Sequence, residues 1–200
     1  MGSGIAQVAA TNGDDVILRD LDDGLLDDAF ETIRQSLDRI VDAGKLTESE
    51  AGKVVESIDG TTVLGDLADT DVVEAAPEDM EVKREIFADL DDIVPDDVVL
   101  ATNTSTLSIT SIASVTDRPE FVVGLHFMNP VPVMDGVELV VGEKTADDVV
   151  QFGHDLAADL EKETWESEDK PGFVTNRILI PWINEGIRAY DEGVATKEDV

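Results

Sequence analysis

The stretch Phe121–Gly142, FVVGLHFMNPVPVMDGVELVVG, contains two apolar runs that are separated by a proline-containing turn. We expect the first run to form a strand that ends at His126, and the second to form a returning strand that carries Glu138. An imidazole titrates near neutral pH and a buried carboxylate can fix its tautomer, so the two side chains suit a general base and the group that orients it. The alternative is a histidine satisfied in the core and a glutamate at the rim of the sheet.

The composition indicates an acidic protein with a core of ordinary size. The chain has 200 residues, of which 42% are hydrophobic, and this suits one domain or one domain with a fragment of a second. It carries 46 acidic against 14 basic residues, a formal charge of -32, and the acids are spread along its length. Such a surface repels nucleic acid and anionic membranes, and it is typical of proteins that work in molar salt, where the Debye length is about 3 Å. We therefore expect neither nucleic acid nor a membrane as a partner.

Two further features narrow the class of protein. There is no cysteine and there are only two histidines, so we expect no metal site. No apolar run reaches the length of a membrane span, and the chain opens without a basic leader. We expect a soluble, cytoplasmic protein.

The first twenty residues have the pattern of a dinucleotide-binding site. Met1–Asn12 is predicted to be a helix rich in small residues, and the strand that follows ends in Asp20. Gly2 and Gly4 would let the backbone approach a pyrophosphate, and Asp20 would accept hydrogen bonds from the adenosine ribose of NAD. The strand and glycines that precede Gly2 in such a motif are absent, so we expect unpaired edges on the two strands beside their place. The alternative is an ordinary helix followed by a strand-end acid.

The remaining pattern alternates helices and strands, which predicts an α/β fold. We expect a Rossmann-like, doubly wound sheet without its first strand in residues 1–169, and the start of an all-α C-terminal domain in residues 170–200. The hydroxyl-rich loop 102–106 follows a strand, where open α/β sheets bind ligands. His154 is predicted to be a solvated surface residue. Helices are expected at residues 25–44, 80–93, 109–113, 145–160 and 174–190. Two more are expected to begin at Thr47, with Glu50 as a capping box, and at Thr196. Strands are expected at 15–20, 63–64, 71–76 and 98–101.

Five motifs resemble one family in order and spacing, the L-3-hydroxyacyl-CoA dehydrogenases, and among them the 3-hydroxybutyryl-CoA dehydrogenases. They are MGSGIAQVAA, VVEAAPEDMEVKREIF, TNTSTLSIT, GLHFMNPVPVMDGVELV and KPGFVTNRILIPWINEG. The resemblance implies NAD-dependent oxidation of an (S)-3-hydroxyacyl-CoA to a 3-oxoacyl-CoA in fatty-acid or butanoate metabolism. It also implies a homodimer for the full-length family.

The resemblance also implies roles for individual residues. His126 would be the catalytic base and Glu138 the group that holds it, while Ser105 and Asn176 would hydrogen-bond the reacting oxygen of the substrate. Ser36 would contact the coenzyme A moiety. The cofactor-binding residues implied in the same way are Gly2, Gly4, Asp20, Glu78, Lys83 and Asn129.

The sequence also departs from the family's pattern. The first strand and most of the helical domain are missing, and Met1 aligns with a methionine inside the family's glycine loop. The coding sequence upstream is then expected to encode an apolar strand ending in Gly-x-Gly-x. The helical hairpin that contacts coenzyme A is acidic here, at Asp38 and Asp42, where many relatives carry lysines. The alternatives are a non-catalytic remnant or partner-binding module of the same fold, and a hydroxyacid dehydrogenase that acts without coenzyme A.

Overall fold

The computed structural model describes all 200 residues, as seven α-helices, seven strands and two short 3-10 turns. The helices are α1 (Gly2–Asn12), α2 (Asp23–Asp42), α3 (Glu48–Glu56), α4 (Met80–Asp91), α5 (Ile109–Ala113), α6 (Asp147–Asp159) and α7 (Thr175–Asp191). The strands are β1 (Val16–Arg19), β2 (Ile58–Thr61), β3 (Val72–Glu74), β4 (Leu100–Thr102), β5 (Val122–Phe127), β6 (Gly136–Val141) and β7 (Glu163–Glu168). No helix has the length and apolarity that a membrane span requires.

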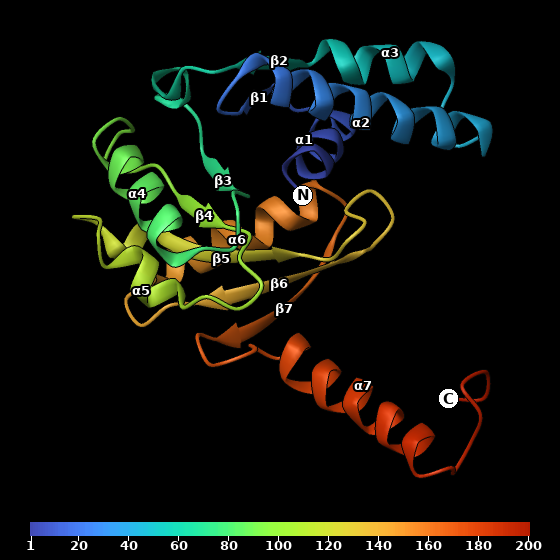
Figure 1. Cartoon of the computed structure of the whole chain (residues 1–200). Coiled ribbons are helices and arrows are strands. Elements are labelled where there is room, and N and C mark those ends of the chain that lie inside the picture. The colour runs from blue at the N-terminus through green and yellow to red at the C-terminus, as the bar shows by residue number, and fades with distance from the viewer.

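The strands form two separate sheets. The larger has the order β3-β4-β5-β6-β7, and every neighbouring pair in it is parallel except β5 and β6. The smaller is the parallel pair β1-β2, which lies with α2 and α3 on one side of the larger sheet (Figure 1). The α/β prediction is confirmed, and so are the two unpaired edges, because β1 and β3 each pair on one side only.

Side chains on the two faces of the larger sheet pack against different helices. Along β5, Val123, Leu125 and Phe127 belong to the core cluster that includes residues of α1 and α6. Val122 belongs to the opposite cluster, which includes residues of α4 and α5. Because successive strand residues point to opposite faces, His126 lies on the same face as Val122. The strand therefore presents its histidine on the side of α4 and α5.

Local signals in the sequence set several helix ends. Gly13 ends α1 in the left-handed region, at φ +105°, where a residue with a Cβ would be strained. Thr47 and Glu50 form the predicted capping box at the start of α3. Gly193 follows α7 at φ +72°. The predicted capping box is confirmed, and each of these three helix ends depends on neighbouring residues alone.

Two predictions of secondary structure were wrong, and one strand was not predicted. The strand expected at residues 63–64 lies instead at Ile58–Thr61, because Ile58 packs into the core between α1, α2 and α3 and pairs with Val16 of β1. Strand β7 was missed, because its sequence ETWESE contains three glutamates and only one large apolar residue. The segment from Thr196 forms a turn closed by Asp199 rather than a helix.

Candidate active site

His126 and Glu138 form a hydrogen-bonded pair between β5 and β6. They are direct partners in the antiparallel register, so both side chains project from the same face of the sheet. His126 Nδ1 lies 3.0 Å from Glu138 Oε2. Glu138 is completely buried, whereas His126 is 7% exposed, so a ligand can reach the pair only through the imidazole.

The second oxygen of Glu138 connects the pair to the start of α7. Glu138 Oε1 accepts hydrogen bonds from the backbone N–H groups of Val174, at 2.7 Å, and Thr175, at 3.0 Å. Burial alone would raise the pKa of Glu138, but the hydrogen bonds from His126 and from these N–H groups outweigh burial and hold the pKa below its ordinary value. The Glu138 carboxylate is therefore ionised at neutral pH. The Phe173 ring packs edge-on against the imidazole, with 6.3 Å between the ring centroids.

Ser105 and Asn176 also meet at this edge of the sheet. Ser105 lies in the loop after β4, and Asn176 lies in the first turn of α7. Asn176 Nδ2 donates a hydrogen bond of 2.9 Å to the backbone carbonyl of Ser105. The hydrogen bonds that Ser105 makes use its backbone, so its hydroxyl remains available to a ligand. The first turn of α7 thus contacts both Glu138 and the Ser105 loop.

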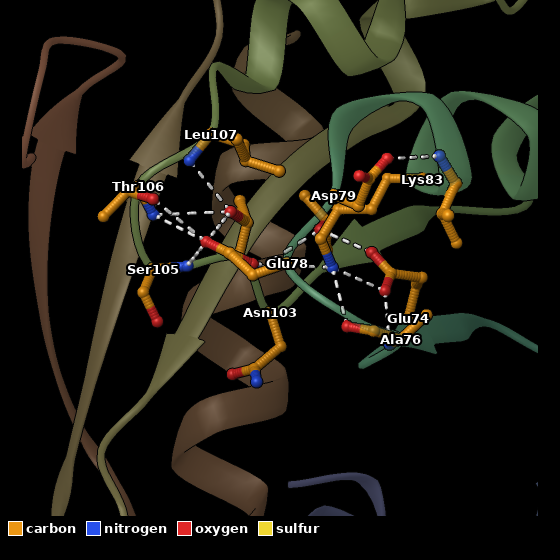
Figure 2. A network of polar contacts seen from close by, with 12 residues as sticks. Glu74, Ala76, Glu78, Asp79, Lys83, Asn103, Ser105, Thr106 and Leu107 are labelled. Carbon is orange, nitrogen blue, oxygen red and sulfur yellow. Dashed lines mark hydrogen bonds and ion pairs between the residues drawn. The ribbon is translucent and has the colours of Figure 1, made fainter.

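The Glu78 carboxylate binds the Ser105 loop from the opposite side. Its Oε1 atom accepts hydrogen bonds from the hydroxyl of Thr104 and from the N–H groups of Ser105 and Thr106, at 2.7, 2.9 and 3.0 Å (Figure 2). Its Oε2 atom makes no hydrogen bond and lies 3.8 Å from Lys83 Nζ. The resemblance placed Glu78 near the cofactor, and Oε2 is the atom that such a contact could use.

Lys83 is buried, which limits the contacts it can make. Its side chain is 1% exposed, and Nζ lies 2.7 Å from Glu74 Oε1 and 3.2 Å from the Ala76 carbonyl. The other oxygen of Glu74 accepts a hydrogen bond of 2.7 Å from the hydroxyl of Thr102 at the end of β4. In this structure the Lys83 ammonium ion therefore holds the ends of two strands and the loop before α4, rather than projecting into open space.

A cleft of about 260 Å³ opens between α1, α2 and the loop that joins β5 to β6. It brings together three of the predicted binding residues, Gly4, Ser36 and Asn129, and adds Arg39, which was not predicted. A Cβ added at Gly4 would lie 3.2 Å from the Cβ of Val131, so glycine permits the close approach of α1 to this loop. Arg39 is the cation that lines the cleft, and it makes no salt bridge.

The remaining predicted cofactor residues lie outside the cleft. A Cβ added at Gly2 would meet the Cβ of Ala75, just after β3, at 3.7 Å. Asp20 directly follows β1, and its Oδ1 atom accepts a hydrogen bond of 2.8 Å from the Leu21 N–H group.

The sequence predicted that His154 is a solvated surface residue, but its side chain makes two specific contacts. Its Nδ1 atom lies 2.7 Å from the Thr164 hydroxyl, and its Nε2 atom lies 2.7 Å from Glu166 Oε1. The side chain is 28% exposed and connects α6 to β7. Both ring nitrogens are already engaged, which separates this histidine from His126.

Two polar residues near the site were not predicted. Glu74 lies in the apolar run VVEAA, and an acid inside an apolar strand was the signal that identified Glu138. Lys162 donates hydrogen bonds to the carbonyl groups of Val131, at 3.0 Å, and Met134, at 2.8 Å, and so holds the loop that carries Asn129. No local pattern marks Lys162, because its partners lie about 30 residues away.

Comparison with known proteins gives matches over nearly the whole chain. Residues 1–170 match the family model described as "3-hydroxyacyl-CoA dehydrogenase, NAD binding domain", and residues 172–200 match the model of the C-terminal domain. A 3-hydroxybutyryl-CoA dehydrogenase of Clostridioides difficile is 41% identical over 201 residues, which cover 100% of this chain and 72% of that protein.

Two crystal structures are similar over the full chain. One is FadB2 of Mycobacterium tuberculosis, with a TM-score of 0.96, 42% identity, and coverage of 100% of this chain and 71% of that one. The other is the (S)-3-hydroxybutyryl-CoA dehydrogenase PaaH1 of Ralstonia eutropha, with a TM-score of 0.95, 41% identity and the same coverage.

Proposed function

We propose that this chain, which belongs to the 3-hydroxyacyl-CoA dehydrogenase family, oxidises (S)-3-hydroxyacyl-CoA substrates such as 3-hydroxybutyryl-CoA to 3-oxoacyl-CoA with NAD as the oxidant. The observation that carries the proposal is the buried carboxylate of Glu138 on Nδ1 of His126. It lies where the first turn of α7 meets the Ser105 loop. A base, a hydroxyl and an amide are thereby gathered at one edge of a Rossmann-like sheet.

His126 acts as the general base through its Nε2 atom. The ionised Glu138 accepts the Nδ1–H, which leaves a lone pair on Nε2 to take the proton of the substrate's 3-hydroxyl group. As the imidazole gains the proton, the negative charge of Glu138 stabilises the imidazolium. In the reverse reaction the same imidazolium returns the proton to the oxygen of the 3-oxo group.

Ser105 and Asn176 hold the reacting oxygen in place. The Ser105 hydroxyl is available to donate a hydrogen bond to that oxygen. Asn176 uses one N–H of its amide on the Ser105 carbonyl, which leaves a second N–H for the substrate. When the oxygen is held between these groups and Nε2 of His126, the substrate is aligned for hydride transfer to NAD. Such alignment accounts for much of the rate gain in enzyme reactions of this kind.

The N-terminal elements fit NAD. No side chain caps the start of α1, so its first N–H groups can bind a pyrophosphate, and Gly4 allows close packing beside it. Asp20, directly after β1, would accept a hydrogen bond from a ribose hydroxyl, and Oε2 of Glu78 is an unused acceptor next to the Ser105 loop. Bound NAD would supply the hydride acceptor.

The cleft between α1, α2 and the β5–β6 loop fits the coenzyme A portion of the substrate. Ser36 offers a hydroxyl there, and Arg39 an unpaired positive charge for a phosphate. The protein has a charge of -32, so an anionic substrate reaches this cleft most readily when salt screens the surface.

We also infer a cytoplasmic location at high salt and a homodimer for the full-length family fold. The charge of -32 supports the first inference. The exposed apolar side chains of Trp182, Ile187 and Tyr190 on α7 support an association that covers this helix.

The test is the oxidation of NADH with acetoacetyl-CoA by this chain in molar KCl. Turnover that requires both the coenzyme A thioester and NADH would establish the reaction. Turnover of free acetoacetate at the same rate would indicate a hydroxyacid dehydrogenase instead. NADH binding should be measured in parallel, because a chain that binds neither NADH nor acetoacetyl-CoA would be the non-catalytic remnant.

A further inference from the structure

We propose that Glu78 is a positioning residue, which holds the loop Thr104–Thr106 so that the Ser105 hydroxyl faces the reacting oxygen. This inference rests on the proposed function, which assigns the Ser105 hydroxyl to that oxygen. It adds a role that differs from a cofactor contact, because it uses the opposite oxygen of the same carboxylate.

A single oxygen of Glu78 binds the whole loop. Oε1 accepts hydrogen bonds from the hydroxyl and the N–H of Thr106, from the N–H of Ser105 and from the hydroxyl of Thr104. In Figure 2 the Ser105 side chain points away from this carboxylate. The loop is therefore held by its backbone and by its two flanking threonines, while the serine hydroxyl stays available.

The carboxylate has to be ionised to bind the loop in this way. Burial alone would raise the pKa of Glu78, but the bonds from the Thr104 hydroxyl, the Ser105 N–H and the Thr106 hydroxyl, together with the Lys83 charge, hold it below its ordinary value. Hydrogen bonds to an ionised acceptor are about twice as strong as those between neutral groups. A loop of small polar residues, with no apolar anchor at its tip, depends on such bonds for its conformation.

The segment that carries Glu78 is itself held by hydrogen bonds to Glu74 and Lys83. Glu74 accepts a hydrogen bond from the Ala76 N–H group, and the Lys83 ammonium ion binds both Glu74 and the Ala76 carbonyl. Asp79 caps the first turn of α4. Glu78 thus projects from a rigid connection between β3 and α4, which allows it to set the position of a loop 27 residues further along the chain.

The Ser105 loop also supports Asn176, so its displacement would affect two groups of the site. The Ser105 carbonyl accepts the hydrogen bond from Asn176 Nδ2. If the loop moves, the serine hydroxyl and the asparagine amide lose their common geometry. Misplacing a substrate-positioning group by about 1 Å can lower the rate about a hundredfold.

The experiment compares Glu78→Ala and Glu78→Gln with Glu81→Ala, which removes an equal charge from a nearby exposed position in the first turn of α4. Exchange of the Ser105 and Thr106 amide hydrogens in the full chain reports the loop directly, and it needs no turnover. We expect Glu78→Ala to speed this exchange about tenfold or more. Glu78→Gln should speed it less, because it keeps an acceptor oxygen but loses the charge, and Glu81→Ala should have no effect. Unchanged exchange in Glu78→Ala would overturn the proposal whatever the enzyme's reaction proves to be.

A double-mutant cycle with Ser105→Ala gives the second readout. Glu78→Ala is expected to lower kcat for acetoacetyl-CoA about tenfold or more in the wild-type background. The loss should be clearly smaller in Ser105→Ala, because only the Asn176 amide is then left for the loop to misplace. Equal losses in both backgrounds would refute the positioning role and assign Glu78 to the cofactor alone. A wild-type chain without turnover would count against the proposed function, and the exchange measurement would still decide the role of Glu78.

Discussion

Glu138 stands directly across the β5–β6 ladder from His126, with Oε2 at 3.0 Å from Nδ1. The two residues are 12 positions apart in sequence, and the antiparallel register alone brings them together. Because the opposite oxygen of Glu138 binds the start of α7, the orientation of the imidazole depends on both the sheet and this helix.

His126→Ala should slow the reaction strongly while leaving NADH binding unchanged. Loss of a general base costs about a hundredfold to ten-thousandfold in rate. We expect kcat for acetoacetyl-CoA to fall within that range in molar KCl. His154→Ala is the matched control, since both nitrogens of that histidine serve contacts between α6 and β7, and its kcat should remain near that of the wild type. Equal losses in the two variants would refute the assignment of the base.

Glu138→Gln should lower kcat more than it changes the KM for NADH. The amide has nearly the same shape as the carboxylate, but it lacks the charge that stabilises the imidazolium and can favour the wrong tautomer of His126. We expect a loss of about a hundredfold in kcat, measured by steady-state kinetics across pH. A variant that retains the full rate at every pH would show that the pair is only structural.

Asp169→Asn should destabilise the fold in a pH-dependent way. The Asp169 carboxylate accepts hydrogen bonds from the Ser108 hydroxyl, at 2.7 Å, and from the Thr110 N–H group, at 2.8 Å. Burial would raise the pKa of Asp169, but the Thr110 and Ser108 bonds hold it below the ordinary value of 3.8. We expect the free energy of unfolding to fall by about 1–2 kcal/mol near pH 7.

The sign of the pH dependence follows from the lowered pKa of Asp169. The contribution is complete above the pKa of the unfolded chain, and it is lost as the pH falls through the lower folded value. Urea unfolding of wild type and variant in KCl should therefore differ by a constant amount from neutral pH down to about pH 5, and the difference should shrink below about pH 4. A difference that grows in acid would contradict this assignment.

Arg39→Gln should raise the KM for acetoacetyl-CoA, because it removes the cation that lines the cleft. Arg34→Gln removes the same charge from the same helix, but Arg34 stacks over Phe30 and does not line the cleft, so the KM of this variant should change less.

The KM of the wild type for acetoacetyl-CoA should rise as KCl is lowered, since screening of the acidic surface weakens. A KM that is flat or falls as KCl is removed would contradict the electrostatic account.

Gly4→Ala and Gly52→Ala should have opposite consequences. A Cβ at Gly52 in α3 meets nothing within 4 Å, so alanine should raise the free energy of unfolding by about 0.5–1 kcal/mol. A Cβ at Gly4 would press on Val131 at 3.2 Å, so the helical gain should be offset and NADH binding weakened. Urea unfolding and NADH titration measure the two effects, and an equal gain at both sites would contradict the close packing at Gly4.

The sequence alone was sufficient for features that depend on neighbours along the chain or on a periodic pattern. The left-handed end of α1 at Gly13 and the capping box of Thr47 and Glu50 are of this kind, because a cap is decided within four residues. The two apolar runs of Phe121–Gly142 likewise placed His126 and Glu138 on two strands joined by a turn. The family followed from motifs that are continuous in sequence.

Only the tertiary structure decided which polar groups share partners. Lys83 is buried on Glu74, and Glu78 binds a loop 27 residues away, because strand ends that are distant in sequence meet at one edge of the sheet. The place of β2 and the existence of β7 were decided in the same way, by pairing with β1 and β6 rather than by their own composition. Composition and spacing report the polarity of a side chain, whereas its partner is chosen by contacts across the fold, where burial makes an unpaired polar group costly.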